Sequence, residues 1–193
     1  MTGNHVFRLD IGCGRKKREG FLGIDVCPAS FADVLADPER GLPFKENVIS
    51  EVWMHHVFEH LGNPVAVMEE IWRVCRDGAK VEIRGPHFST PYLVWGDPTH
   101  KRGLSLGTFE YFNGTWYGAR VKFEVERCIL KKGNTSFKDA GWRFWYWPFV
   151  LPNRIIEFLV NRSEVWIHRY ERLASRIVAF EEIRVILSVC KSR

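Results

Sequence analysis

A short apolar segment that runs into two glycines constrains the fold of this chain most. Residues 6–11 have the composition of a buried strand, and Gly12 and Gly14 follow it directly. Glycine adopts positive φ and has no Cβ, so the chain can turn sharply there and a ligand can approach the backbone. A second short strand, residues 21–24, ends on Asp25. Because an acid at the end of the second strand binds ribose hydroxyls in nucleotide-binding folds, the pattern predicts an α/β sheet with a ligand at its strand ends.

The spacing of these groups differs from that of dinucleotide-binding proteins. Asp25 lies 15 residues after Asp10, whereas about 20 residues normally separate the glycine loop from the acid. We therefore expect the first crossover helix to be shortened to about one turn, or to be absent. Lys17 occupies the position of the third glycine, which makes pyrophosphate a poor ligand. A β-turn-β unit with a purely structural role is the alternative interpretation of the glycine pair.

Four segments within residues 9–83 resemble, in the same order, motifs of the class I S-adenosylmethionine-dependent methyltransferases, in the type-11-like branch that acts on small molecules and glycans. They are Leu-Asp-Ile-Gly-Cys-Gly at 9–14, Asp-Pro-Glu-Arg-Gly-Leu-Pro-Phe at 37–44, His-His-Val-Phe-Glu-His at 55–60, and Glu-Ile-Trp-Arg-Val-Cys-Arg-Asp-Gly-Ala at 70–79. The last segment departs from the family pattern at its turn. The resemblance implies a Rossmann-like fold with a mostly parallel seven-stranded sheet, and an enzyme that uses S-adenosylmethionine.

The resemblance also implies which residues bind the cofactor. The glycine loop would surround the methionine part, Asp25 would bind the ribose, and Asp37 would accept a hydrogen bond from the adenine amino group. An ordinary Asp-Pro turn is the alternative role for Asp37. The expected cofactor residues are Asp10, Gly12, Cys13, Gly14, Asp25, Val26, Asp37, Leu42 and His55.

The 193 residues are expected to form one methyltransferase domain, with a cofactor-binding half at 1–84 and acceptor-side loops, an insertion and the last two strands at 85–193. Hydrophobic periodicity and turn residues predict the remaining elements. The predicted strands are 31–35, 48–55, 79–83, 121–130 and 181–190. The predicted helices are 64–75, a short one from Ser105 through Phe112, and two in the C-terminal insertion near 153–161 and 164–180.

Two histidines are candidates for the catalytic base. His56 follows the fourth predicted strand, where it would border the transferable methyl group, and His100 lies in a long irregular segment at 85–107 together with Asp97. An imidazole of ordinary pKa, near 6.5, can accept a proton at neutral pH, and Asp97 would orient it. The Asn/Asp-Pro-Pro-Tyr/Phe motif of amino-methylating nucleic-acid enzymes is absent after the fourth strand. A hydroxyl on a small-molecule, sugar or lipid-linked acceptor therefore fits best.

No metal site is expected. His56 and His60 have a spacing that can bind zinc, but no third ligand is evident from the sequence. The five cysteines lack metal-binding spacing, and their odd number indicates a reducing, cytoplasmic environment. No apolar run is long enough to span a membrane, and no signal-peptide pattern is present.

Charge is distributed unevenly along the chain. Residues 1–119 carry 13 Lys/Arg and 15 Asp/Glu, whereas residues 120–193 carry 15 Lys/Arg and 8 Asp/Glu, for a total of +5. The basic part also holds an aromatic segment at 141–152. It could form core with a lid over the acceptor, contact an anionic membrane peripherally, or stack on single-stranded nucleic acid. A nucleic-acid-binding module and a cofactor-binding protein without turnover are the alternative functions. The sequence does not indicate an oligomeric state.

Overall fold

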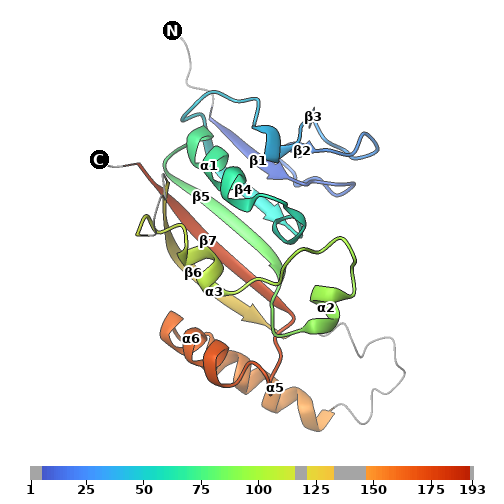
Figure 1. Cartoon of the computed structure of the whole chain (residues 1–193), viewed down its shortest axis with the longest axis vertical. Helices are drawn as coiled ribbons and strands as arrows, with labels where there is room; N and C mark the ends of the chain where they lie inside the picture. The colour runs from blue at the N-terminus through green and yellow to red at the C-terminus, as the bar shows by residue number, and fades with distance from the viewer. Residues whose placement is uncertain (1–5, 116–120, 133–146, 192–193) are drawn as a thin grey trace.

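The computed structural model describes residues 6–115, 121–132 and 147–191. Its centre is a seven-stranded sheet with the order β3-β2-β1-β4-β5-β7-β6 (Figure 1). The strands are β1 (Phe7–Ile11), β2 (Leu22–Asp25), β3 (Val34–Leu35), β4 (Ile49–His55), β5 (Cys75–Pro86), β6 (Lys122–Lys131) and β7 (Glu182–Cys190). The first five are parallel, and β7 pairs antiparallel with both β5 and β6. The mostly parallel, Rossmann-like sheet expected from the sequence is therefore confirmed.

Five α-helices and two short 3₁₀ helices lie within the described residues. They are η1 (Pro38–Arg40), η2 (Phe58–His60), α1 (Pro64–Val74), α2 (Pro91–Trp95), α3 (Leu106–Glu110), α5 (Trp147–Val160) and α6 (Glu164–Leu173). Figure 1 shows α1 and α3 over the near face of the sheet, and α5 and α6 beyond the end of β6. None of these helices is long and apolar enough to cross a membrane.

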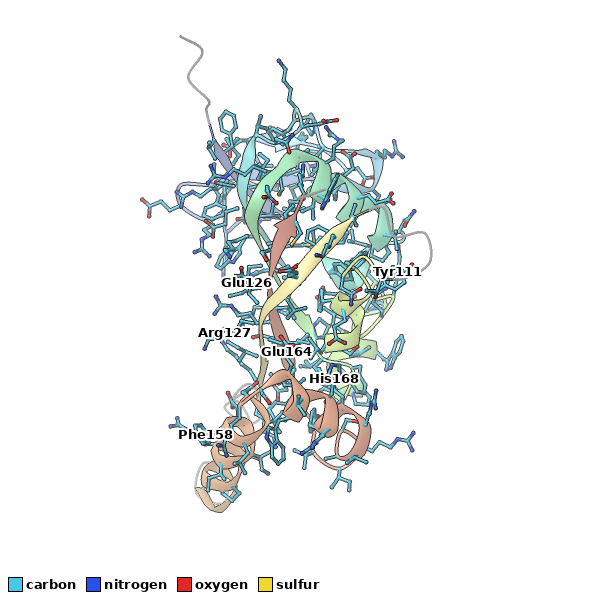
Figure 2. All side chains as sticks on the ribbon, turned by 90° about the vertical axis from the view of Figure 1, so that its left-hand side faces the viewer. Tyr111, Glu126, Arg127, Phe158, Glu164 and His168 are labelled. Carbon is cyan, nitrogen blue, oxygen red and sulfur yellow. The ribbon has the colours of Figure 1, made fainter. Side chains whose placement is uncertain are left out.

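The two faces of the sheet differ in chemistry. In β7 the side chains of Ile183, Val185, Leu187 and Val189 alternate with half-buried ones and belong to the main core. On the opposite face, Glu82 accepts a hydrogen bond from Arg184 (2.7 Å) and contacts His55 (3.1 Å). Figure 2 shows Tyr111, just after α3, on one side of the sheet and Arg127 pointing to the other. The apolar core therefore lies mainly between the sheet and the layer formed by α1 and α3.

The connection between β1 and β2 contains no helix, which is the second of the two outcomes that its spacing predicted. Residues 12–21 form turns instead. The carboxylate of Asp10 accepts a hydrogen bond from Arg18 N–H (2.8 Å), and Gly12 N–H donates to Ile24 O (2.7 Å). These contacts bring the chain straight back to the sheet, and so few residues leave no length for a helical crossover.

Several predicted boundaries are wrong. Strand β3 has two residues instead of five, because Phe31 N–H donates to Gly14 O before the chain joins the sheet. Strand β5 begins at Cys75, directly after α1, and a register shift in its pairing with β4 absorbs the predicted turn. Helix α5 begins six positions earlier than predicted and holds Pro152 inside. Helix α6 ends at Leu173, well before Phe180.

Candidate active site

The turn after β1 depends on glycine. Gly12 has a φ of +71°, and Gly14 has a φ of +51°. A Cβ on Gly12 would lie 2.1 Å from Val57 Cγ2, whereas one on Gly14 would meet no atom within 4 Å. Gly12 therefore meets two demands at once, a left-handed backbone and close packing against the chain that follows β4.

The backbone amides of this turn are already used within the protein. Gly12 N–H and Cys13 N–H donate to Ile24 O (2.7 and 3.3 Å), and Gly14 N–H donates to Asp25 Oδ2 (2.8 Å). A phosphate-binding loop needs free amides that converge on the anion. At these three positions the amides are directed to β2 instead, so the turn is not built for pyrophosphate.

A pocket of about 380 Å³ lies at the carboxyl ends of β1 and β2. This volume falls in the range of small-molecule sites, and strand ends are where open α/β sheets bind ligands. Four residues predicted to bind the cofactor meet there, namely Gly12, Asp25, Val26 and Asp37. The other lining residues are Ile11, Ile24, Pro38, Glu39, Val57, His60 and Leu61.

Two carboxylates face the pocket in fixed positions. Asp25 Oδ1 accepts from Cys27 N–H (2.8 Å), and its other oxygen accepts from Gly14 N–H. Asp37 Oδ1 accepts from Glu39 N–H (3.0 Å), and Oδ2 pairs with Arg40 (3.4 Å). Because each carboxylate oxygen can accept a second hydrogen bond, both side chains still offer acceptors to a ligand.

Five residues predicted to bind the cofactor do not line the pocket. Asp10 and Cys13 are buried beneath the turn, where burial raises the pKa of the Asp10 carboxyl and of the Cys13 thiol. Gly14 turns the chain next to the pocket and binds Asp25. Leu42 is buried in the core below α1, and its N–H donates to Glu70.

His55 lies on the opposite face of the sheet, because side chains alternate along β4. Its ring stacks on Trp53 with centroids 3.8 Å apart, and Nε2 contacts Glu82. Burial lowers the pKa of His55. His55 is therefore not part of the pocket lining, whereas His60, from η2, is. The alternation of side chains along β4 from the buried Met54 already indicates that His55 faces the other side of the sheet.

His56 is held between two carboxylates. Its backbone has a φ of +54°, Nδ1 lies 3.2 Å from Glu59 Oε1, and Nε2 lies 3.8 Å from Glu182 Oε2. The carboxylates of Glu182 and Glu59, of which Glu59 is the closer, raise the pKa of His56 to about 9. The ring is therefore an imidazolium at neutral pH. The ordinary pKa assumed from the sequence is wrong for His56, and the ring cannot accept a proton there.

His100 is oriented by the backbone of α2. Its Nδ1–H donates to Leu93 O (3.0 Å) and Val94 O (3.1 Å), which leaves the Nε2 lone pair available. Nε2 lies 3.8 Å from Asp97 Oδ2 and 4.0 Å from Glu59 Oε1. Hydrogen bonds from Thr99 lower the pKa of Asp97, so this carboxylate is ionised.

The loop that carries His100 packs directly on η2. Lys101 N–H donates to Glu59 O, and the guanidinium of Arg102 donates to Leu61 O, both at 2.8 Å. The rings of His60 and His100 stand edge to face with centroids 4.6 Å apart. Loop residues 97–102 therefore stand beside the pocket through His60. Asp97, His56 and His100 themselves are not part of the pocket lining.

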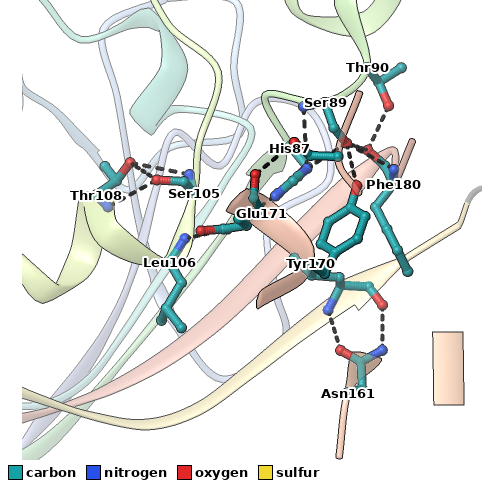
Figure 3. Close-up of polar contacts among 12 residues, drawn as sticks. His87, Ser89, Thr90, Ser105, Leu106, Thr108, Asn161, Tyr170, Glu171 and Phe180 are labelled. Carbon is teal, nitrogen blue, oxygen red and sulfur yellow. Dashed lines mark hydrogen bonds and ion pairs between the residues drawn. The ribbon is translucent and has the colours of Figure 1, made fainter. Parts of the chain in front are cut away.

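A buried polar network fixes the segment that follows β5, which the sequence predicts to lie on the acceptor side (Figure 3). His87 is fully buried and contacts Ser89 Oγ (2.8 Å) through Nδ1 and Glu171 Oε1 (3.2 Å) through Nε2. The hydroxyl of Tyr170 donates to Val178 O (2.6 Å) and lies 2.9 Å from Ser89 Oγ. The network joins the segment after β5 to α6, so α6 holds this loop in place.

The C-terminal helices expose apolar side chains. The exposed fractions of Phe158, Leu173 and Ile177 are 70%, 79% and 85%. The predicted aromatic cluster of residues 141–146 lies outside the described residues, as do the side chains of Trp147 and Phe149. The described part of the insertion is thus only partly core.

Comparison with known proteins agrees with the site. Residues 9–83 match a family model described as a methyltransferase domain. No match was found among curated proteins. Solved structures similar to this chain include a SAM-dependent methyltransferase from Archaeoglobus fulgidus (20% identity, 96% of this chain and 87% of that chain, TM-score 0.55). The YcgJ protein from Bacillus subtilis is another (14% identity, 98% and 94%, TM-score 0.58).

A third similar structure is larger. Phosphoethanolamine N-methyltransferase 2 from Haemonchus contortus, in complex with phosphomonomethylethanolamine and S-adenosylhomocysteine, is 16% identical with a TM-score of 0.55. The alignment covers 97% of this chain but 49% of that one. At these identities the structural likeness establishes the fold, and the family match covers the cofactor-binding half.

Proposed function

We propose that this chain, whose residues 9–83 match a methyltransferase domain, is a class I S-adenosylmethionine-dependent methyltransferase and that it methylates a hydroxyl group of a small-molecule, sugar or lipid-linked acceptor. The observation that carries the proposal is the pocket at the ends of β1 and β2, where Gly12, Asp25 and Asp37 meet. These are the residues through which the sequence resembles the family.

The cofactor is proposed to span the pocket from the glycine turn to η1. Asp25 would accept hydrogen bonds from the ribose hydroxyls, since both of its oxygens are held by backbone amides. Asp37 would accept the adenine amino group, with Val26 and Leu61 against the flat base. The methionine part would pass over Gly12, where any larger residue would collide with Val57.

The reaction needs little covalent chemistry from the protein. The acceptor oxygen forms a bond to the methyl carbon, the carbon–sulfur bond breaks, and its electron pair stays on sulfur to give neutral S-adenosylhomocysteine. The protein must align the acceptor and take the hydroxyl proton. His100 Nε2 is the proposed proton acceptor because Nδ1 is bonded to backbone carbonyls, with Asp97 beside it. His56 is assigned no such role, since both of its ring nitrogens face carboxylates.

The acceptor atom is proposed to be oxygen because the sequence lacks the amine-methylation motif after β4. A nitrogen acceptor is the competing proposal, and the similar Haemonchus contortus enzyme is named for N-methylation. Tandem mass spectrometry of the labelled product distinguishes the two, because its fragments show whether the methyl group is on oxygen or on nitrogen, and the intact mass identifies the acceptor.

A lipid-linked acceptor at an anionic membrane is favoured by one surface. Helices α5 and α6 and the turns that follow them expose Phe158, Trp166 and Ile177, and the same segment exposes five arginines, which are Arg154, Arg162, Arg169, Arg172 and Arg176. Apolar side chains with nearby positive charge suit the headgroup region of an anionic bilayer. Nucleic acid is the competing proposal, in which aromatic side chains of this region would stack on bases.

The test is calorimetric titration of S-adenosylmethionine, followed by labelling. The wild-type chain should bind the cofactor, and Asp25→Ala should weaken binding by about 10- to 100-fold, because the ribose hydroxyls lose their acceptor. Asp77→Ala, which removes an exposed carboxylate that binds Lys191 N–H far from the pocket, is the matched control. Absence of binding, or equal affinity in Asp25→Ala, would reject the cofactor site.

Incubation with methyl-labelled cofactor and fractionated lysate then identifies the acceptor class. Label in a lipid, glycan or small-molecule fraction supports the proposal, and label only in RNA overturns it. His100→Ala should keep cofactor affinity and lose about 10²–10⁴ in rate. A chain that binds the cofactor and labels no fraction would be a binder without turnover.

A further inference from the structure

We propose that Glu59, His60 and His100 form a binding site for one divalent transition-metal cation, of which Zn²⁺ is the best match. The ligand atoms that these three side chains offer all lie within 4.8 Å of one another. The proposal goes beyond methyl transfer, and cation binding does not depend on the proposed function.

The residue types fit this class of ion. Two imidazoles and one carboxylate bind zinc in catalytic sites that keep a fourth position open, whereas magnesium and calcium prefer oxygen ligands alone. In a tetrahedral zinc site with bonds of about 2.0–2.2 Å, ligand atoms stand about 3.3–3.5 Å apart. His100 Nε2 and Glu59 Oε1 are 4.0 Å apart, so small side-chain rotations bring them to bonding distance.

Both histidines are held in the way that metal-binding histidines usually are, by a hydrogen bond from the other ring nitrogen. For His100 the partners are the carbonyls of Leu93 and Val94. For His60 the partner is Thr99 Oγ1, at 2.9 Å from Nδ1. Since the Thr99 hydroxyl proton goes to Asp97 Oδ1 (2.6 Å), His60 Nδ1 must be the donor. Each ring therefore keeps a free lone pair on Nε2.

Glu59 supplies the second, independent observation. Its side chain is fully buried, and its Oε2 has no hydrogen-bond partner among the described residues. A buried carboxylate oxygen without a partner is costly, and an ion is one of the groups that can satisfy it. Its other oxygen, Oε1, contacts His56 Nδ1 (3.2 Å) and lies 4.0 Å from His100 Nε2, so a cation at the two histidines would meet Oε1 first.

The placement of the cluster gives the cation a use. His60 lines the pocket, and Asp97, 3.8 Å from His100 Nε2, stands where a fourth ligand or an acceptor could approach. A bound cation lowers the pKa of an oxygen acid that coordinates it. This use rests on the proposed function: His100 would then hold the ion, and the cation would replace it as the group that makes the acceptor lose its proton.

This site could not be predicted from the spacing of residues, because its third ligand, His100, lies far from Glu59 and His60 in the sequence. His60 and His100 are separated by forty positions, and only the packing of loop residues 97–102 on η2 brings them together. The spacing-based search paired His60 with His56, which instead lies between Glu59 and Glu182.

Equilibrium dialysis with Zn²⁺, and with Co²⁺ as a spectroscopic probe, tests the site on the full chain without a histidine tag, after removal of metals by a chelator. The expected result is one equivalent per chain and visible Co²⁺ absorption typical of four-coordinate nitrogen and oxygen ligands. His60→Ala and His100→Ala should each weaken binding at least about 100-fold, because each removes one of three ligands. Asp97→Asn should weaken it less.

The matched control is His168→Ala, which removes a histidine of α6 that is paired with Glu110 of α3. Circular dichroism checks that each variant is folded. If an alanine variant is not folded, His60→Asn or His100→Gln replaces it. No binding by the wild-type chain, binding that survives loss of both histidines, or an equal loss in His168→Ala would each overturn the proposal. Titration of the same metal-free samples with S-adenosylmethionine separates this outcome from failure of the cofactor site.

Discussion

The contacts that stabilise the two halves of this domain differ in how far apart their partners lie in the sequence. In the predicted cofactor half, residues 1–84, the turn after β1 is fixed by partners that are close in sequence: Asp10 binds Arg18, and Asp25 binds Gly14. In the predicted acceptor half, residues 85–193, His87 binds Glu171 and Ser89 contacts Tyr170, more than eighty positions away. A local motif can therefore specify the turn in the first half, whereas the contacts in the second half form only when distant segments of the chain come together.

The halves also differ in how they present apolar surface. The cofactor half buries its strand ends around a pocket, and its polar groups are satisfied by backbone amides. The acceptor half ends in helices with exposed Phe158 and Ile177. We infer that the stability of the first half depends mainly on local backbone geometry, and that the stability of the second depends mainly on contacts between distant segments. The following predictions test this difference, beginning with the largest effect.

Gly12→Ala should destabilise the chain most, by about 2–5 kcal/mol. The fold holds position 12 in a left-handed conformation that alanine disfavours, and the added Cβ would collide with Val57 Cγ2. The costs of backbone strain and of overpacking therefore add. Gly14→Ala is the matched control. It shares the positive φ but meets open space, so it should cost only about 1–2 kcal/mol. Urea unfolding of both variants measures the difference, and equal losses would show that packing against Val57 is not what requires glycine.

Tyr170→Phe should cost about 1–3 kcal/mol in the acceptor half. It removes the hydroxyl that donates to Val178 O and contacts Ser89, and it leaves a buried carbonyl without its donor. Tyr92→Phe is the control, because Tyr92 is 79% exposed and should change stability by less than about 0.5 kcal/mol. If Tyr170→Phe is as silent as Tyr92→Phe, the long-range network does not hold the acceptor half.

The sequence could predict the cofactor half because its determinants are local. Gly12, Gly14, Asp25 and Asp37 stand at strand ends within short stretches, and the structure gathers all of them around one turn and one pocket. His55 and Leu42 lie outside the pocket lining for a physical reason as well. Strand alternation sends His55 to the opposite face, and the bond to Glu70 draws the Leu42 backbone toward α1.

The sequence could not predict the acceptor-side geometry. The pKa of His56 depends on Glu182, which arrives from the last strand. The approach of His100 to His60 depends on a loop that has no repeating pattern. The length of α5 could not be predicted either, because Pro152 normally marks a helix start and here lies inside the helix. Each of these features requires contacts between distant segments.

Phe158→Ser combined with Ile177→Ser should leave stability nearly unchanged, within about 0.5 kcal/mol each, because both side chains are exposed. If this surface meets an anionic membrane, the double variant should sediment less with anionic vesicles than the wild-type chain does, and neutral vesicles should retain neither. The control is Tyr92→Ser, an equally exposed change on α2. Steeply salt-dependent binding to single-stranded RNA, without vesicle binding, would assign the surface to nucleic acid.

The last predicted effect depends on pH and concerns Glu70, whose carboxylate accepts hydrogen bonds from Leu42 N–H and from Arg73. The Arg73 guanidinium lowers the pKa of Glu70, so the ionised form stabilises the folded state. That contribution is present above the carboxyl pKa of the unfolded chain and is lost as the pH falls through the lower pKa of the folded chain. Because the pair is partly exposed, solvent screening limits it to about 0.5–1 kcal/mol.

Glu70→Gln should therefore be less stable than the wild-type chain at pH 7, and the two should converge as the pH drops through the acid range. Glu124→Gln, at an exposed carboxylate near Lys122 on β6, is the control and should show a smaller difference at every pH. Urea unfolding from neutral to acid pH measures both. A Glu70→Gln deficit that stays constant down to the lowest pH would mean that packing of the Leu42 segment, and not charge, accounts for it. In that case the cofactor half would be held by backbone geometry alone.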